Sequence, residues 1–101
     1  MRTAIVSFSF AICSLASAAG VLYEGPGMHG SIIVEEDTAG MRTLRFERNG
    51  ARQSVVKPGD PDHLELSYSR TMLAGLALSE RIQRVLVLGL GGGSLPMFLH
   101  K

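Results

Sequence analysis

The residues with the clearest chemical meaning are three glycines at alternate positions, Gly89, Gly91 and Gly93, which follow an uninterrupted apolar run. Glycine here lets the chain turn sharply and lets a ligand approach the backbone with no Cβ in the way. A helix that begins after the turn would add N–H groups without partners inside the helix. The pattern predicts a loop that binds a nucleotide-type cofactor. The alternative is a strand-to-helix turn that serves only packing.

Two familiar cofactor loops do not fit this stretch. A phosphate-binding loop would close on Gly-Lys-Ser/Thr, which does not occur here, and the dinucleotide pattern Gly-x-Gly-x-x-Gly fails at Ser94. A nicotinamide-cofactor domain would also require an acidic residue after the next strand. The form Gly-x-Gly-x-Gly is more typical of loops that bind S-adenosylmethionine-type cofactors.

The elements around the loop follow from hydrophobic pattern. Arg84 to Leu88 is apolar after its first residue, which predicts a central parallel strand buried on both faces. Pro96 favours a new helix that runs toward Lys101. Together these elements would form the first strand, glycine loop and helix of a cofactor-binding α/β unit.

An amphipathic helix is predicted upstream, from about Asp62 to Leu78. Asp60 is a good N-cap and Pro61 suits the first helical position. An apolar stripe then recurs every four residues, at Leu64, Tyr68, Met72 and Leu76. Spacing alone therefore favours Tyr68 as a core residue of this stripe.

Before the helix, the pattern predicts a small antiparallel β-meander. Its strands are expected at 31–36, 41–47 and 52–56, where β-branched or alternating apolar residues occur. Residues 37–40 form a turn cluster, and Asn49-Gly50 is a strong hairpin-turn signal because both residues tolerate positive φ. So few strands are marginal alone and usually need a covering element.

Residues 1–20 differ from the rest of the chain. Arg2 precedes an apolar run, and Ala16-Ser17-Ala18 fits the cleavage pattern of a secretory signal peptide. Cleavage after Ala18 would give a periplasmic or secreted protein; an uncleaved chain, with a disordered extension or a misassigned start, would be cytoplasmic. Cys13, the single cysteine, falls in this leader, so no intramolecular disulfide is expected.

Composition excludes several function classes. The chain of 101 residues has a formal net charge of +1 and no tryptophan, which argues against binding of nucleic acid or of an anionic membrane. The three histidines, His29, His63 and His100, lack metal-ligand spacing, so no metal is expected. No serine has a plausible base in the sequence, which disfavours a hydrolase.

Taken in order, these features resemble the N-terminal part of the spermidine synthase-like (polyamine aminopropyltransferase) family. The similarity lies in Asn49 to Ser54, Leu66 to Met72 and Arg84 to Gly93, and it covers about 21–101. The resemblance implies a β domain that contributes to subunit association beside a Rossmann-like domain that binds decarboxylated S-adenosylmethionine and a polyamine.

The resemblance also implies roles for single residues. Gln53 and the loop glycines Gly89, Gly91 and Gly93 would bind the cofactor, S-adenosylmethionine or its decarboxylated form, and Tyr68 would line the substrate cleft. The amide of Gln53 suits such a contact because it offers both a donor and an acceptor. Gln53 as a strand-end surface residue is the alternative.

The chain also departs from that family. Aminopropyltransferases usually carry His-Glu-Met or Gln-Glu-Met after the tyrosine, where this chain has Ser69-Arg70-Thr71-Met72, and an aspartate where it has Gly92. A cationic polyamine needs carboxylates. The departures argue against spermidine synthesis as such and favour the methyltransferase-like members. The catalytic aspartate of the family has no counterpart, so catalytic residues are not assigned.

We therefore predict an α+β fold in three parts: the leader 1–20, a β-meander domain 21–57, and 58–101 as the first helix, strand and glycine loop of a truncated Rossmann-like domain. A βαβ unit needs about 30 residues or more, and eight follow Gly93. An incomplete cofactor site without turnover is expected. The alternative is a non-enzymatic meander module that associates with a second copy or a partner.

Overall fold

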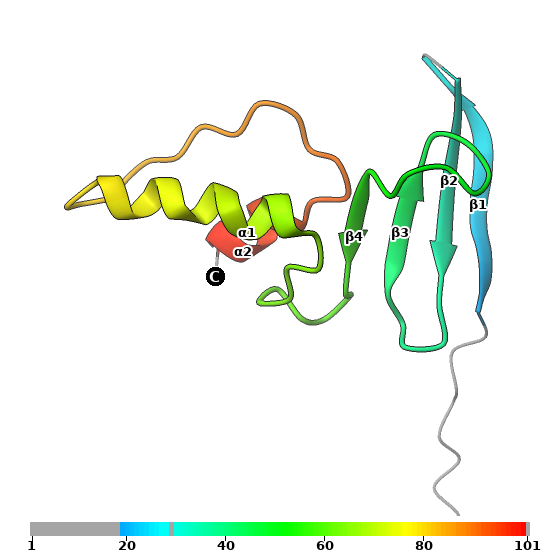
Figure 1. The fold of residues 1–101 in the computed structure, drawn as a ribbon, viewed down its shortest axis with the longest axis horizontal. Helices are drawn as coiled ribbons and strands as arrows, with labels where there is room; N and C mark the ends of the chain where they lie inside the picture. Colours follow the sequence, from blue (N-terminus) through cyan, green and yellow to red (C-terminus); the bar gives the residue numbers. More distant parts are fainter. Residues whose placement is uncertain (1–18, 29, 101) are drawn as a thin grey trace, which may run out of the picture.

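The computed structural model describes residues 19–28 and 30–100. Its main element is a four-stranded antiparallel sheet with the order β1-β2-β3-β4 (Figure 1). The strands are β1 (Gly20–Gly27), β2 (Gly30–Glu36), β3 (Arg42–Arg45) and β4 (Ser54–Val56). The predicted meander is thereby confirmed, with one more strand than the sequence pattern indicated.

The additional strand is β1, and its sequence conceals it. Glycine and proline in Gly25-Pro26-Gly27 indicate a turn, yet these residues pair with Gly30 to Ile32 of β2. The register shifts between Val21 and Tyr23, which marks a bulge on this edge strand. The predicted leader lies outside the described residues except for Ala19 and Gly20, and Gly20 pairs with Glu36 at the start of β1.

The predicted turn at 37–40 joins β2 to β3. The Asp37 carboxylate accepts hydrogen bonds from the backbone N–H groups of Ala39 and Met41, both at 2.9 Å. Gly40 has a φ of 75°, a conformation that favours glycine. This turn fixes the register in which Glu36 lies opposite Arg42.

The predicted Asn49 turn lies between β3 and β4. Asn49 has a φ of 59°, and the Gly50 N–H donates to the Glu47 carbonyl at 3.2 Å. The strand predicted at 41–47 is shorter in the structure, because β3 ends at Arg45 and Phe46 is exposed in the connection. The guanidinium of Arg45 donates to the Gly50 carbonyl and so ties the connection to the strand.

Charged side chains bridge neighbouring strands of the sheet. Arg42 pairs with Glu36 at 2.7 Å and Arg45 with Glu35 at 3.0 Å. Arg48 pairs with Glu24, which links the β3–β4 connection back to β1. Solvent-exposed pairs of this kind contribute about 0–1 kcal/mol each, so they favour the register more than they stabilise the sheet.

The first helix begins later than predicted. α1 spans Ser67–Leu73 and continues as the 3-10 helix η1, Ala74–Leu78. Asp60 and Pro61 do not start it; they lie in turns, and the N-cap is Leu66, with no side-chain cap hydrogen bond. The predicted end at Leu78 agrees with the end of η1.

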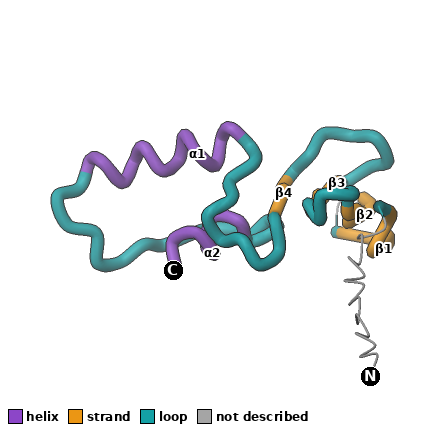
Figure 2. Tube along the Cα trace, turned by 90° about the horizontal axis from the view of Figure 1, so that it is seen from below, coloured by secondary structure: helices purple, strands orange, loops and turns teal. Residues whose placement is uncertain are grey.

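The predicted strand from Arg84 to Leu88 is wrong. The residues lie outside any helix or strand, and Leu86 and Leu88 are 83% and 88% exposed. A parallel strand exists only through its hydrogen bonds to neighbouring strands, and no described segment lies beside this one to supply them. Figure 2 shows it as part of the long loop that leaves η1 and returns to α2 (Ser94–His100). The predicted helix near Pro96 is confirmed as α2.

The core is small and lies in the sheet and just after it. Its buried apolar side chains are Ile33 in β2, Val55 in β4 and Leu64 in the connection to α1. The predicted helix stripe is buried only in part: Leu64 belongs to the core, whereas Tyr68 and Met72 are 50% and 55% exposed. Among the described residues, no helix has the length and apolar character needed to cross a membrane.

Ile33, at 1% exposure, is the best-buried apolar side chain of the sheet. We expect Ile33→Ala to lower the free energy of unfolding by about 2–5 kcal/mol, because it removes buried methyl groups and leaves a cavity. Urea unfolding followed by circular dichroism measures this. Val21→Ala at an exposed β1 position serves as the control, and equal losses in the two variants would contradict the assigned core.

Candidate functional site

Gln53 and Tyr68 meet at the junction between the sheet and α1. Gln53 directly precedes β4, and Tyr68 is the second residue of α1. The Tyr68 hydroxyl donates to the backbone carbonyl of Gln53 at 3.1 Å. The Gln53 N–H donates to the Leu44 carbonyl at 2.9 Å. The backbone of Gln53 is thus held on both sides while the residue remains exposed.

Tyr68 is not a core residue, contrary to what its place in the apolar stripe predicted. Half of its surface is exposed, and the buried residue of α1 is its neighbour Ser69. The Ser69 hydroxyl donates to the Leu66 carbonyl at 2.8 Å, which satisfies it within the first turn. Tyr68 therefore remains half exposed while its hydroxyl lies against the backbone of Gln53.

The glycine loop has the backbone conformation that its sequence predicts. Gly89, Gly91 and Gly93 have φ values of 86°, 57° and 82°, which non-glycine residues rarely adopt. The Gly93 N–H donates to the Leu90 carbonyl at 3.0 Å and closes the turn before α2. Gly89 and Gly91 are exposed, so a ligand could reach this backbone.

The loop lies against the start of β4, at Ser54. A Cβ built on Gly91 would lie 3.5 Å from Ser54 Oγ, and one built on Gly92 would lie 2.8 Å from it. Ser54 itself is buried, with 3% exposure. Since Gln53 precedes Ser54 and bonds to Tyr68, the structure brings Gln53, Tyr68 and Gly91 to one small region. Gly89 and Gly93 have no other part of the protein within 4 Å of a built Cβ.

Ser54 is the residue of this region to which the sequence assigned no role. It lies within the stretch Asn49 to Ser54 that carries the family resemblance. A small residue at the first position of a short strand, next to Gln53, is the signal that could have indicated close approach of another backbone.

A network of charged side chains around Glu65 adjoins the site. Glu65 accepts hydrogen bonds from Arg52 and from the ring of His63, both at 3.2 Å. The hydrogen bond with His63, followed by that with Arg52, lowers the pKa of Glu65 below its ordinary value. The network ties the segment before α1 to the residue that precedes Gln53.

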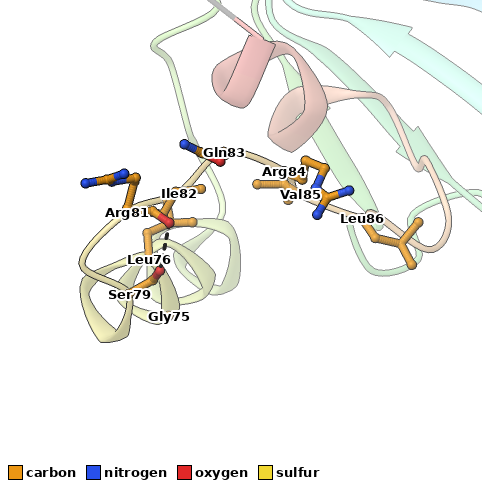
Figure 3. Close-up of a pocket in the computed structure, with 9 residues that line it drawn as sticks. All are labelled: Gly75, Leu76, Ser79, Arg81, Ile82, Gln83, Arg84, Val85 and Leu86. Atoms are coloured by element: carbon orange, nitrogen blue, oxygen red, sulfur yellow. Dashed lines mark hydrogen bonds between the residues drawn. The ribbon is translucent and has the colours of Figure 1, made fainter.

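Two hollows lie along residues 81–88. The first, about 520 Å³, opens between η1 and residues 81–86, and Figure 3 shows its two guanidinium groups, Arg81 and Arg84, pointing to opposite sides. Ser79 Oγ donates to the Arg81 carbonyl at 3.2 Å there. The second, about 400 Å³, is apolar and is lined by side chains such as Met72, Val87 and Leu99. In neither hollow do polar side chains converge on one point.

A metal centre is not indicated in the part of the chain that the structure describes. Within it no group of three or more His, Cys, Asp or Glu side chains could hold a metal ion. His63 is engaged with Glu65, and His29 lies outside the described residues.

Comparison with known proteins finds a sequence similarity over most of this chain. It is 33% identical over 82 residues to the polyamine aminopropyltransferase of Vibrio vulnificus (strain CMCP6). The matched region is 78% of this chain and 27% of that protein, so the chain spans about a quarter of the relative's length. No protein-family model matches the chain, and no solved structure matches it significantly. The similarity supports a spermidine synthase-like transferase relationship at the level of the family.

We expect Tyr68→Phe to lower the free energy of unfolding by about 0.5–1.5 kcal/mol, because it removes the hydroxyl that bonds to the Gln53 carbonyl. Urea unfolding of the full chain measures this change. Tyr23→Phe, at a similarly exposed tyrosine of β1, is the matched control. A loss no larger than that of the control would show that the hydrogen bond does not hold the junction.

Glu65 should titrate at a lower pH than an ordinary glutamate. Its folded-state pKa is depressed, so its contribution to stability is present above the unfolded pKa and is lost as the pH falls through the folded pKa. NMR titration of the side-chain carboxyl carbon measures the midpoint. Arg52→Gln should move the midpoint upward by removing one partner, and a midpoint unchanged by this variant would contradict the network.

Proposed function

We propose that residues 53–93 form one wall of a spermidine synthase-like site for an S-adenosyl ligand. The observation that carries this proposal is the meeting of Gln53, Tyr68 and Gly91 at the start of β4, although they are far apart in the sequence. The similarity to a polyamine aminopropyltransferase supports the same reading. The ligand class is S-adenosylmethionine or decarboxylated S-adenosylmethionine.

Each group of this wall has a distinct chemical use. The exposed amide of Gln53 can donate and accept hydrogen bonds toward a polar edge of the ligand. The glycine loop lets the ligand approach main-chain atoms closely because no Cβ intervenes. The ring of Tyr68 flanks Gln53 and offers an apolar face, while its hydroxyl is engaged with the Gln53 carbonyl.

The reaction partner of the ligand is not expected to be a polyamine. α1 has no acidic residue in its first turn and carries Arg70 where the related enzymes carry a carboxylate. Gly92 likewise offers no side chain. A polyamine would place ammonium groups beside Arg70 with no carboxylate from α1 or the loop to bind them. We infer that methyl transfer, or ligand binding without transfer, fits the chain better than aminopropyl transfer.

The wall is one-sided in the part of the chain that the structure describes. Residues 84–92 are exposed, and the contacts of the glycine loop lie on the side of Ser54 and β4. Affinity for a small ligand depends on enclosing most of its surface. The 101-residue chain alone is therefore expected to bind weakly and to show no turnover.

Titration of the ¹⁵N-labelled chain with S-adenosylmethionine, and separately with its decarboxylated form, tests the proposal. We expect shifts at the Gln53 side-chain amide and at Gly89 to Gly93, with an affinity weaker than micromolar. ATP serves as the control for non-specific binding of a nucleotide. Absence of shifts at these positions at millimolar ligand would refute the site, and micromolar affinity by calorimetry would refute the one-sided wall.

A further inference from the structure

The packing of the glycine loop on β4 points to a role for Ser54. We propose that Ser54 is the positioning residue of this loop and that it forms a steric pair with Gly92. The side chain of Ser54 occupies the volume that any side chain at position 92 would need. The loop is thereby held at one distance from Gln53, the neighbour of Ser54.

The geometry at Gly92 leaves a side chain too little room on the side that faces β4. A Cβ built there would lie 2.8 Å from Ser54 Oγ and 3.2 Å from Ser54 Cβ. The hydroxyl could rotate away, but the Cβ could not, because Ser54 pairs with Leu44 in the sheet and is buried. Relief of the clash therefore requires the loop itself to move away from β4.

The other loop glycines are required for a different reason. Gly89, Gly91 and Gly93 have positive φ, so a substitution there strains the backbone whatever the surrounding space. At Gly91 the built Cβ would make only an ordinary contact, 3.5 Å from Ser54 Oγ. Gly92 has no positive φ, and its need for glycine comes from the neighbouring side chain.

The Ser54–Gly92 pair also restricts which chemical groups of a ligand can bind at position 92. This step rests on the proposed function. Because Ser54 excludes a side chain at 92, a ligand meets only main-chain atoms there. Main-chain N–H groups suit an uncharged or anionic group of the ligand, whereas an ammonium group would find no carboxylate at position 92. Ser54 thus acts on ligand choice through the loop and without contacting the ligand.

A double-mutant cycle in the full chain without ligand tests the pair. Gly92→Ala should lower the midpoint of thermal unfolding by roughly 5–10 °C, as expected for overpacking in a small domain. In the Ser54→Gly background the same change should cost less than half as much, because the clashing atoms are gone. Equal losses in both backgrounds, or no loss in either, would overturn the proposal.

Two control variants separate the clash from other effects. Gly75→Ala lies in η1 with open space around its built Cβ and no positive φ, so the midpoint should not fall. Gly91→Ala should lower the midpoint through its φ, and Ser54→Gly should not rescue it. Rescue of Gly91→Ala to the same extent as Gly92→Ala would contradict a specific pair.

A second measurement applies if Gly92→Ala does not fold. Ser54→Ala retains the Cβ and removes only Oγ, so it should shift the amide signals of Gly91 to Gly93 and leave those of β1 unchanged. Unchanged loop signals would overturn the positioning role. These experiments use no ligand, so failure of S-adenosyl binding would refute the proposed function and leave the steric pair to be judged by the cycle.

Discussion

The structure depends on a narrow junction at two adjacent residues, Gln53 and Ser54. Tyr68 reaches the first through a hydrogen bond, and the loop at Gly91 and Gly92 packs on the second. On one side lies the sheet with Ile33 and Val55 as its core, and on the other lie two short helices (Figure 1). A hydrogen bond of this kind contributes about 0.5–1.5 kcal/mol, so close packing of the loop must contribute much of what positions the two halves.

The junction at Gln53 and Ser54 does not bury the apolar stretch that precedes the glycine loop. Leu86, Leu88 and Leu90 are 83%, 88% and 70% exposed. Burial of apolar surface is worth about 25 cal/mol per Å², and little of this stabilisation is realised along the stretch. The loop is therefore fixed only at its C-terminal end, by β4 and α2, and its N-terminal end at Gly89 has no neighbour within 4 Å of a built Cβ.

Local features of the fold could be predicted where local chemistry decides them. The Asp37 turn and the Asn49 turn follow from side-chain acceptors and positive φ, so the meander was correct. The predicted start of α1 is wrong. Asp60 and Pro61 are residue types that suit the start of a helix, but here they lie in turns that do not lead into one. In the segment after these turns, Glu65 accepts hydrogen bonds from Arg52 and His63, and α1 begins only at Ser67.

Features that depend on distant partners could not be predicted in this way. The segment from Arg84 to Leu88 has the composition of a central strand, but strand formation requires a neighbouring strand that no local pattern provides. Glycine and proline concealed β1, whose pairing with β2 defines it as a strand. The candidate site divides similarly: the glycine loop is predicted from its own spacing, Gln53 and Tyr68 are indicated by the family resemblance, and Ser54 requires knowledge of what packs against it.

The backbone and the side chain of Gln53 have different roles, and the functional interpretation depends on this difference. Its N–H is bonded to Leu44 and its carbonyl accepts the Tyr68 hydroxyl, so its backbone serves the fold. Its side chain is exposed and can serve a ligand. Tyr68 shows the reverse, since its side-chain hydroxyl serves the fold by bonding to the Gln53 carbonyl. In this arrangement Tyr68 holds Gln53 in place, and under the proposed function polar recognition of the ligand would fall to the Gln53 amide and the loop backbone.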